Sequence, residues 1–264
     1  MTNIIEVKNL KKSFGTLEAV KGISLSVEPG TTFGFLGPNG AGKSTTIKML
    51  TTLLRPTSGT ILIDGNNPIT HPNAVRRSFG IVFQDPSLDD DLTAWENMEL
   101  HGVLYGVNRK TRRARIDELL KFVDLDDRRR SYVREFSGGM KRRLEIARGL
   151  LHHPKIIFLD EPTLGLDPQT RNHMWEYLGQ LNQSMGITVF FTTHYLDEAD
   201  RIADTIAIID HGCIVASGTG EQLKRQTGKD SLEDAFLELT GRNIREESAS
   251  GLEHLCRMRR APGR

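Results

Sequence analysis

The sequence predicts an α/β fold: a mainly parallel sheet that carries a phosphate-binding loop, an antiparallel β-subdomain at the N-terminus, and an α-helical subdomain inserted into the core. Two observations predict it. A glycine-rich loop lies between an apolar run and a helical pattern within residues 33–50. Further apolar runs, at residues 79–83, 156–159 and 187–194, are separated by helical patterns, which is typical of a parallel sheet.

The composition of the chain excludes several classes of protein. Among its 264 residues, 35 Lys and Arg stand against 34 Asp and Glu, which argues against a general polyanion binder. The two cysteines, Cys213 and Cys256, form no metal spacing and no disulfide framework, which suits a reducing cytosol. We recognise neither a secretory signal nor a run of about 18 apolar residues. If the protein acts at a membrane, we expect another chain to supply the span.

The segment before the glycine-rich loop indicates β-structure. Residues 4–7 and 23–27 have the composition and partial alternation of strands, and residues 12–15 indicate a polar loop. Phe14 in that loop is interpreted either as an aromatic ring that stacks on an adenine base or as an ordinary core residue. The local sequence does not decide between the two.

The loop at residues 37–45 fits the pattern G-x-x-x-x-G-K-[ST] of a P-loop, in the strand–loop–helix context that the motif requires. Its glycines let backbone N–H groups point at phosphate oxygens, and the helix start adds unpaired N–H groups and the positive end of its dipole. Lys43 supplies a charge for the β- and γ-phosphates, Ser44 is placed to bind Mg²⁺, and Thr45 offers a second hydroxyl. The predicted nucleotide-binding residues of the loop are Gly37, Pro38, Asn39, Gly40, Ala41, Gly42, Lys43, Ser44 and Thr45.

Two further strands are expected after the helix that follows this loop, at residues 60–63 and 79–83. The second stops before Pro86, because proline interrupts regular pairing. Gln84 therefore lies at the carboxyl end of a strand.

Residues 88–150 predict the inserted helical subdomain. Residues 93–96 fit a capping box at a helix start. Five basic residues within 109–115 are interpreted as a solvated helix start, with contact to lipid head groups or a partner as the alternative. The apolar residues of this helix share one face. They are Ile116, Leu119, Leu120 and Val123.

The helical subdomain closes with Ser137, Gly138 and Gly139, at the start of another amphipathic helix. A hydroxyl and two amides without side chains at a helix N-terminus form a second anion site by the same physics as the P-loop. On its own, Ser-Gly-Gly is usually a flexible helix start. The P-loop in the same chain favours the anion site.

The apolar run 156–159 ends in Asp160 and Glu161, which is the Walker B pattern. Asp160 is expected to hold Mg²⁺ directly or through water. Glu161 is the candidate general base, or positioner, for an attacking water. A further buried strand ends in His194, whose imidazole could donate a hydrogen bond to a γ-phosphate oxygen.

Residues 197–200 spell the helicase string DEAD. We reject that interpretation, because the string lies on a predicted helix and Asp160 already fills the Walker B role. The rest of the chain predicts two strands, one helix and a flexible basic tail. These segments are residues 205–209, 212–215, 231–239 and 241–264.

The expected strands bring polar groups to the carboxyl edge of a sheet, where ligands bind in open α/β folds. The set comprises a phosphate-binding loop, the Mg²⁺ ligands Ser44 and Asp160, a base and a γ-phosphate sensor, with Gln84 completing the metal shell. This set predicts a P-loop NTPase core that hydrolyses a nucleoside triphosphate by positioning and electrostatics.

At this point the chain, over residues 1–240, resembles the nucleotide-binding subunits of ABC transporters. The most discriminating part is the string at 136–140, Phe-Ser-Gly-Gly-Met, which looks like the ABC signature. The remaining motif residues follow in the family's order. They are Gln84, Asp160, Glu161, Asp167 and His194.

The resemblance implies ATP and Mg²⁺ as ligands, and a homodimer that forms on ATP binding. Residues 137–139 of one chain would contact the nucleotide bound by the other chain. Asp167 would belong to the loop at the dimer seam. Phe14 matches the adenine-stacking position of the family, which favours that interpretation of the ring.

Residues 85–88, 163–167 and 231–242 resemble the daunorubicin-type antibiotic-resistance exporters, in which ATPase and permease are separate chains. This resemblance implies efflux of a drug or other hydrophobic compound, with a permease docked on residues 85–105. It also implies a peripheral location on the cytoplasmic face of the membrane and no nucleic-acid partner. The alternative is a soluble ABC-type ATPase that acts on nucleic acid or ribosomes. That class usually has a coiled-coil insertion or tandem ATPase domains, and we find neither pattern here. A P-loop kinase is the third class.

Overall fold

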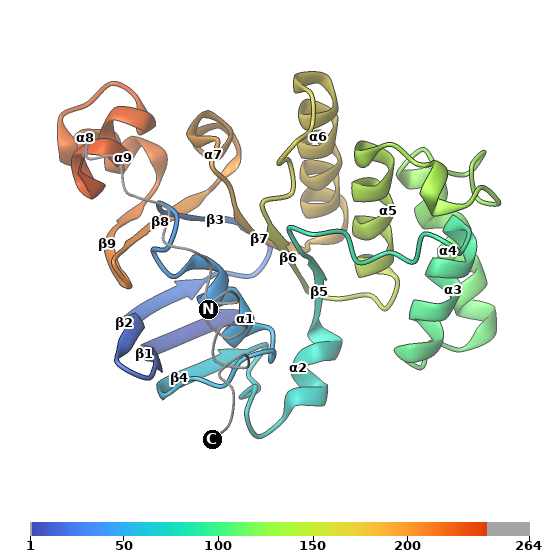
Figure 1. The fold of residues 1–264 in the computed structure, drawn as a ribbon, viewed down its shortest axis with the longest axis horizontal. Coiled ribbons are helices and arrows are strands. Elements are labelled where there is room, and N and C mark those ends of the chain that lie inside the picture. Colours follow the sequence, from blue (N-terminus) through green and yellow to red (C-terminus); the bar gives the residue numbers. More distant parts are fainter. Residues whose placement is uncertain (1, 242–264) are drawn as a thin grey trace, which may run out of the picture.

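The computed structural model describes residues 2–241, which form two sheets with helices around them (Figure 1). A three-stranded antiparallel sheet has the order β2–β1–β4, and a six-stranded sheet has the order β5–β6–β7–β3–β8–β9. In the larger sheet, β9 pairs antiparallel with β8, and the other described pairings are parallel. The predicted fold class is confirmed. Cys256 and, apart from Gly241, the predicted tail lie outside the described residues.

The elements alternate along the chain as expected for such a fold. The strands are β1 (Ile5–Phe14), β2 (Leu17–Val27), β3 (Thr32–Leu36), β4 (Ser58–Ile63), β5 (Phe79–Val82), β6 (Ile156–Asp160), β7 (Thr188–Thr192), β8 (Thr205–Asp210) and β9 (Cys213–Gly218). The helices are α1 (Lys43–Leu50), α2 (Pro72–Ser78), α3 (Ala94–Leu104), α4 (Arg109–Phe122), α5 (Gly138–Leu150), α6 (Pro168–Met185), α7 (Leu196–Ile202), α8 (Gly220–Thr227) and α9 (Leu232–Thr240), with a 3₁₀ turn at Val133–Glu135. Helices α2 and α8 were not predicted.

The first two strands are longer than predicted. They form one antiparallel hairpin in which Phe14 pairs with Leu17, so residues 12–14 are strand and not a polar loop. Gly15, at φ 59°, lies in the turn between them. The prediction was wrong because no side chain of residues 11–14 is fully buried, which removes the apolar alternation that identifies a strand.

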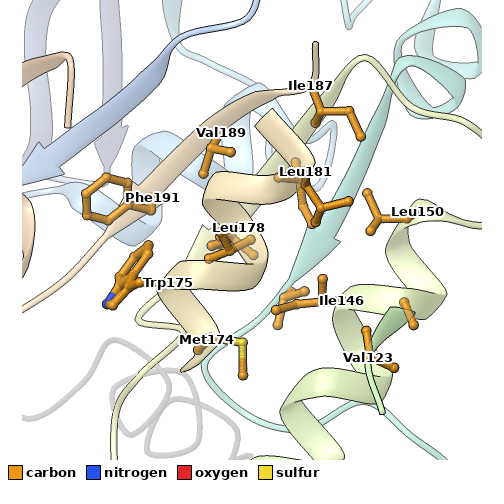
Figure 2. Packing of buried hydrophobic residues seen from close by; sticks show 14 of the residues in the cluster. Val123, Ile146, Leu150, Met174, Trp175, Leu178, Leu181, Ile187, Val189 and Phe191 are labelled. Carbon is orange, nitrogen blue, oxygen red and sulfur yellow. The ribbon is translucent and has the colours of Figure 1, made fainter. Parts of the chain in front are cut away.

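Alternate residues of the central strands face two different cores. In β6, Ile156 and Phe158 belong to the core shared with α1 and the antiparallel sheet, whereas Ile157 and Leu159 belong to the core formed with α5 and α6. Figure 2 shows the second core, where Leu178 and other side chains of α6 pack between the sheet and α5. Burial on both faces explains why these strands appear as continuous apolar runs.

Helices α3, α4 and α5 lie within the predicted helical subdomain, whose limits at 88 and 150 stay a prediction. The capping box at residues 93–96 is confirmed, and the shared apolar face of α4 is buried. The basic run at the start of α4 is only partly solvated. Arg115 is 6% exposed and pairs with Glu118, and Arg112 pairs with Glu99. Within the described residues, no helix is long and apolar enough to cross a membrane.

Strand β5 and helix α5 are in contact at their main chains. A Cβ atom on Gly80 would lie only 2.3 Å from the carbonyl oxygen of Gly149. The absence of a side chain at Gly80 therefore lets α5 lie directly against the sheet beside the strand that leads to Gln84.

Phe190 lies at the centre of the core shared with the antiparallel sheet. It is fully buried, and its ring centroid is 5.2 Å from that of Phe33 and 5.3 Å from that of Phe158. We expect Phe190→Ala to lower the free energy of unfolding by about 3–5 kcal/mol, because it leaves a cavity. Denaturant unfolding checks this. The control Leu104→Ala, at a side chain that is 74% exposed, should change the value by less than about 0.5 kcal/mol. Equal losses would contradict this assignment of the core.

Candidate functional site

Four neighbouring parallel strands end at one edge of the large sheet, in the order β5, β6, β7 and β3 (Figure 1). Each strand leads directly into a predicted functional segment. Gln84 follows β5, Asp160 ends β6, His194 follows β7, and the loop at residues 37–42 follows β3. The structure therefore places the four predicted groups at the same edge of the sheet.

The glycine-rich loop closes tightly against the neighbouring main chain. A Cβ atom on Gly37 would lie 2.3 Å from the carbonyl oxygen of Ile209. Gly42 has φ 112°, and a Cβ atom there would lie 2.7 Å from the carbonyl oxygen of Ala19. The loop thus requires glycine at both positions. It leads into the first turn of α1, where N–H groups lack intrahelical partners and are available to an anion.

Lys43 contacts this loop and interacts electrostatically with the acidic residues at the end of β6. Its Nζ donates hydrogen bonds to the carbonyl oxygens of Gly37 at 2.6 Å and Pro38 at 3.1 Å, and the residue is 7% exposed. Burial lowers the pKa of Lys43, while the charges of Glu161 and Asp160 oppose that shift. The Lys43 amine is therefore within electrostatic range of the two predicted acidic groups.

Thr192, the last residue of β7, connects both acidic residues. Its hydroxyl donates to Oδ1 of Asp160 at 2.7 Å and accepts the N–H of Glu161 at 3.0 Å. Glu161 has φ 52°, in the left-handed region that costs a residue other than glycine about 1–3 kcal/mol. The bond from its N–H to Thr192 helps to hold this conformation.

His194 orients the carboxylate of Glu161. Its Nε2 lies 2.6 Å from Oε1 of Glu161. Oε2 of Glu161 is buried and has no hydrogen-bond partner within residues 2–241. Glu161 thus has one oxygen next to His194 and a second oxygen without a hydrogen-bond partner in the described residues.

The predicted Mg²⁺ ligands are oxygen donors from three elements. Ser44 is exposed on the first turn of α1, Gln84 is exposed after β5, and Asp160 ends β6. Hydroxyl, amide and carboxylate oxygens are the ligands that Mg²⁺ prefers. This set of donors fits Mg²⁺.

The second predicted anion site begins α5. Ser137 caps the helix by accepting the N–H of Met140 at 3.3 Å. A Cβ atom on Gly139 would lie 2.7 Å from Cγ2 of Thr170, so this glycine permits close contact with α6. In the described part of the chain, no hydrogen bond or ion pair joins residues 137–139 to residues 37–45. These contacts of a single chain do not bring the two segments together.

Asp167 and Phe14 complete the predicted set. Asp167 caps α6, and its hydrogen bonds with Thr170, first that from the hydroxyl at 2.6 Å, lower the pKa of its carboxyl group. Phe14 ends β1 and is 48% exposed, with Nζ of Lys12 5.0 Å from its ring centroid. The ring is therefore not part of the core. Its stacking role stays a prediction.

Two residues of the site, Thr192 and Arg142, were not predicted. Arg142 on α5 is 6% exposed and donates at 3.2 Å to the carbonyl oxygens of both Gln84 and Glu161. A hydroxyl directly after the apolar residues 189–191, at the carboxyl end of the strand, could have indicated Thr192. For Arg142, the available signal was the opposite charge of Glu145 three residues later, because residues at this spacing are neighbours on a helix.

Comparison with known proteins adds to this geometry. Residues 20–164 match the family model described as ABC transporter. The chain is 44% identical over 234 residues to the daunorubicin resistance ATP-binding protein DrrA3 of Streptomyces coeruleorubidus, which covers 89% of this chain and 74% of that protein. It is 41% identical over 243 residues to the linearmycin resistance ATP-binding protein LnrL of Bacillus subtilis, covering 92% and 76%. The dimeric structure of a post-hydrolysis state of the ATP-binding cassette MJ0796, bound to ADP and Pi, matches with a TM-score of 0.73 and 31% identity, over 81% of this chain and 98% of that one.

Lys43→Ala tests the phosphate-binding loop. Loss of the charged donor should weaken binding of a nucleoside triphosphate by about 10- to 100-fold, since a hydrogen bond to a charged group contributes about 1.5–3 kcal/mol. Calorimetric titration measures this. The matched control is Lys48→Ala, at an exposed position of the same helix, for which we expect parental affinity. Parental affinity in Lys43→Ala would contradict the assignment.

Proposed function

The chain belongs to the ABC transporter family of ATP-binding proteins, and from that membership we propose that its ATPase activity drives efflux of a drug or other hydrophobic compound through a separate membrane permease. As a member of this family the chain is an ATP-hydrolysing transporter subunit. The observation that supports the residue roles best is the cluster of Lys43, Asp160, Glu161 and His194 at one edge of the sheet.

The residues around α1 bind and orient the triphosphate in this proposal. Backbone N–H groups of the loop and the Lys43 charge contact the phosphates. Mg²⁺, when bound, would supply positive charge that stabilises the negative charge of the phosphates. Ser44, Asp160 and Gln84 would hold it.

Glu161 accepts a proton from the attacking water. Oε1 is paired with Nε2 of His194, and Oε2, which has no hydrogen-bond partner within residues 2–241, would take the proton. The exposed part of the His194 ring contacts a γ-phosphate oxygen. Hydrolysis then depends on the position and charge of these groups, with no covalent intermediate.

Two copies of the chain enclose each ATP. In one copy, residues 137–139 make no hydrogen bond to residues 37–45 within the described chain, and both segments present helix N-termini. In this proposal, the second helix N-terminus that acts on each triphosphate comes from the other copy. Asp167 lies at the seam, and Phe14 stacks on adenine.

The cargo class is proposed from the names of the relatives, and the location from the contact with the permease. The two matched proteins are named for resistance to daunorubicin and linearmycin, which supports export of a drug or similar hydrophobic compound. The permease docks on residues 85–105, where Leu100, Val103 and Leu104 are exposed. The subunit then lies on the cytoplasmic face of the membrane through that contact, and no nucleic acid takes part.

Glu161→Gln tests the base. The substitution keeps the shape and removes the proton acceptor, so ATP binding should persist while turnover falls by about 100- to 10,000-fold. ATP-bound dimers should accumulate, as measured by light scattering. Glu176→Gln, at a side chain that is 67% exposed, is the control and should hydrolyse ATP at the parental rate. Parental turnover in Glu161→Gln would show that the base is a different residue.

Ser137→Arg tests the contribution of the second copy. The larger cation at the start of α5 should leave ATP binding to one chain unchanged, because no bond from residue 137 reaches the loop of its own chain within residues 2–241. It should prevent dimer formation and reduce ATP turnover at least tenfold. Ser184→Arg, at an exposed position of α6, is the control. Dimers and turnover equal to those of the parent would refute ATP binding between two copies.

A further inference from the structure

Three charged residues of α5, Arg142, Glu145 and Arg148, are spaced three residues apart, and we call them the α5 charged stripe. Arg142 and Glu145 are almost fully buried, at 6% and 1% exposure, with Nη1 and Oε2 3.2 Å apart. A buried ion pair keeps its place only when its other polar atoms are also bonded. The hydrogen-bond partners of the remaining polar atoms of Arg142 and Glu145 therefore show which segments the ion pair holds in place.

Arg142 uses its other donors on the main chain of two separate loops. Nη2 donates to the carbonyl oxygens of Gln84 and Glu161, each at 3.2 Å, and Nη1 donates to that of Phe83. The guanidinium group is planar, with donors in fixed directions. One rigid group thus sets the distance between the loop after β5 and the loop after β6.

The other two residues of the stripe hold the same segment at Ser87. Glu145 Oε1 accepts the N–H of Ser87 at 2.7 Å, and Arg148 donates to the carbonyl oxygen of Ser87 at 2.7 Å. The main-chain contact between Gly80 and Gly149 brings α5 and β5 close enough for these bonds. The segment 83–87 is therefore bonded to α5 at both of its ends, through Phe83 and Gln84 at one end and Ser87 at the other.

The hydrogen bond from Arg142 to the carbonyl oxygen of Glu161 helps to hold a strained backbone, because Glu161 has φ 52°. Thr192 accepts its N–H, and Arg142 donates to its carbonyl oxygen. The peptide groups on either side of its Cα atom are thus both held, one from β7 and one from α5. The direction of the Glu161 carboxylate depends on both bonds.

We propose that Arg142, held by Glu145, is a positioning residue for ATP hydrolysis, which fixes the main chain of Glu161 and Gln84 relative to the start of α5. It acts through these two residues and does not itself contact the reacting atoms. The proposal rests on the function proposed above, since it takes Glu161 as the base and Gln84 as a metal ligand. Because residues 137–139 begin the same helix, it links the segment offered to a second copy with the groups that act on water.

The test uses the full chain with Arg142→Gln and Arg142→Lys. Glutamine cannot reach all three carbonyl oxygens, and lysine keeps the charge opposite Glu145 but not the planar set of donors. We expect kcat for ATP to fall by about 10- to 100-fold in both variants, with KM within about threefold of the parent. The Mg²⁺ concentration for half-maximal rate should rise, because Gln84 is no longer held. Hydrogen exchange within residues 83–87 should become faster.

Arg143→Gln is the matched control, since this neighbour on α5 donates to the carbonyl oxygen of Val123 and to no residue of either loop within the described chain. It should keep parental kcat and parental exchange. If Arg142→Gln fails to fold, the double variant Arg142→Gln with Glu145→Gln removes both buried charges together and gives the deciding kcat.

Parental kcat in the folded Arg142 variants, or an equal fall in Arg143→Gln, would overturn the proposal. A large rise in KM with unchanged kcat would do the same. Glu161→Gln, assayed in parallel, separates the positioning role of Arg142 from the assignment of Glu161 as the base. If it is inactive while the Arg142 variants turn over normally, only the positioning role is lost. If it is active, the base assignment is wrong, and the exchange of residues 83–87 still reports whether Arg142 holds that loop.

Discussion

The register between β6 and β7 determines the geometry of the functional edge. Asp160 lies opposite Thr192 in this pairing, and that position lets one hydroxyl bond both Asp160 and the N–H of Glu161. Since side chains alternate between the faces of a sheet, a shift of one residue would turn Thr192 to the other face. The positions of Asp160, Glu161 and His194 therefore depend on main-chain hydrogen bonds between two buried strands.

Much of the fold and of the site could be predicted, because the decisive signals are contiguous in the sequence. The glycine-rich loop, Asp160 with Glu161 at a strand end, and the capping box at 93–96 are each determined by residues a few positions apart. The parallel order of the strands then brings two of these motifs, the glycine-rich loop and Asp160 with Glu161, to one edge. Their roles in binding and hydrolysis are still predictions, whereas their common location is observed.

The parts that could not be predicted depend on contacts between distant residues. Thr192 bonds Asp160 across 32 positions, and Arg142 reaches Gln84 across 58. Neither contact leaves a periodic trace in the sequence. Arg115 shows the same limit, since it belongs to a run with the composition of a solvated surface yet is buried. The polar end of the first hairpin was missed because main-chain pairing, and not apolar burial, makes it a strand.

The place of β3 in the sheet also bears on how the chain folds during its synthesis. This strand pairs with β7 on one side and β8 on the other, through contacts such as Thr32 with Val189 and Phe33 with Thr205. Both neighbours leave the ribosome long after β3 does. Both edges of this apolar strand therefore stay unpaired while more than half of the chain is translated. Unpaired apolar strand edges favour association with chaperones or aggregation. We therefore expect this sheet to form slowly, because β3, the strand that leads into the glycine-rich loop, lies between two strands that are synthesised much later.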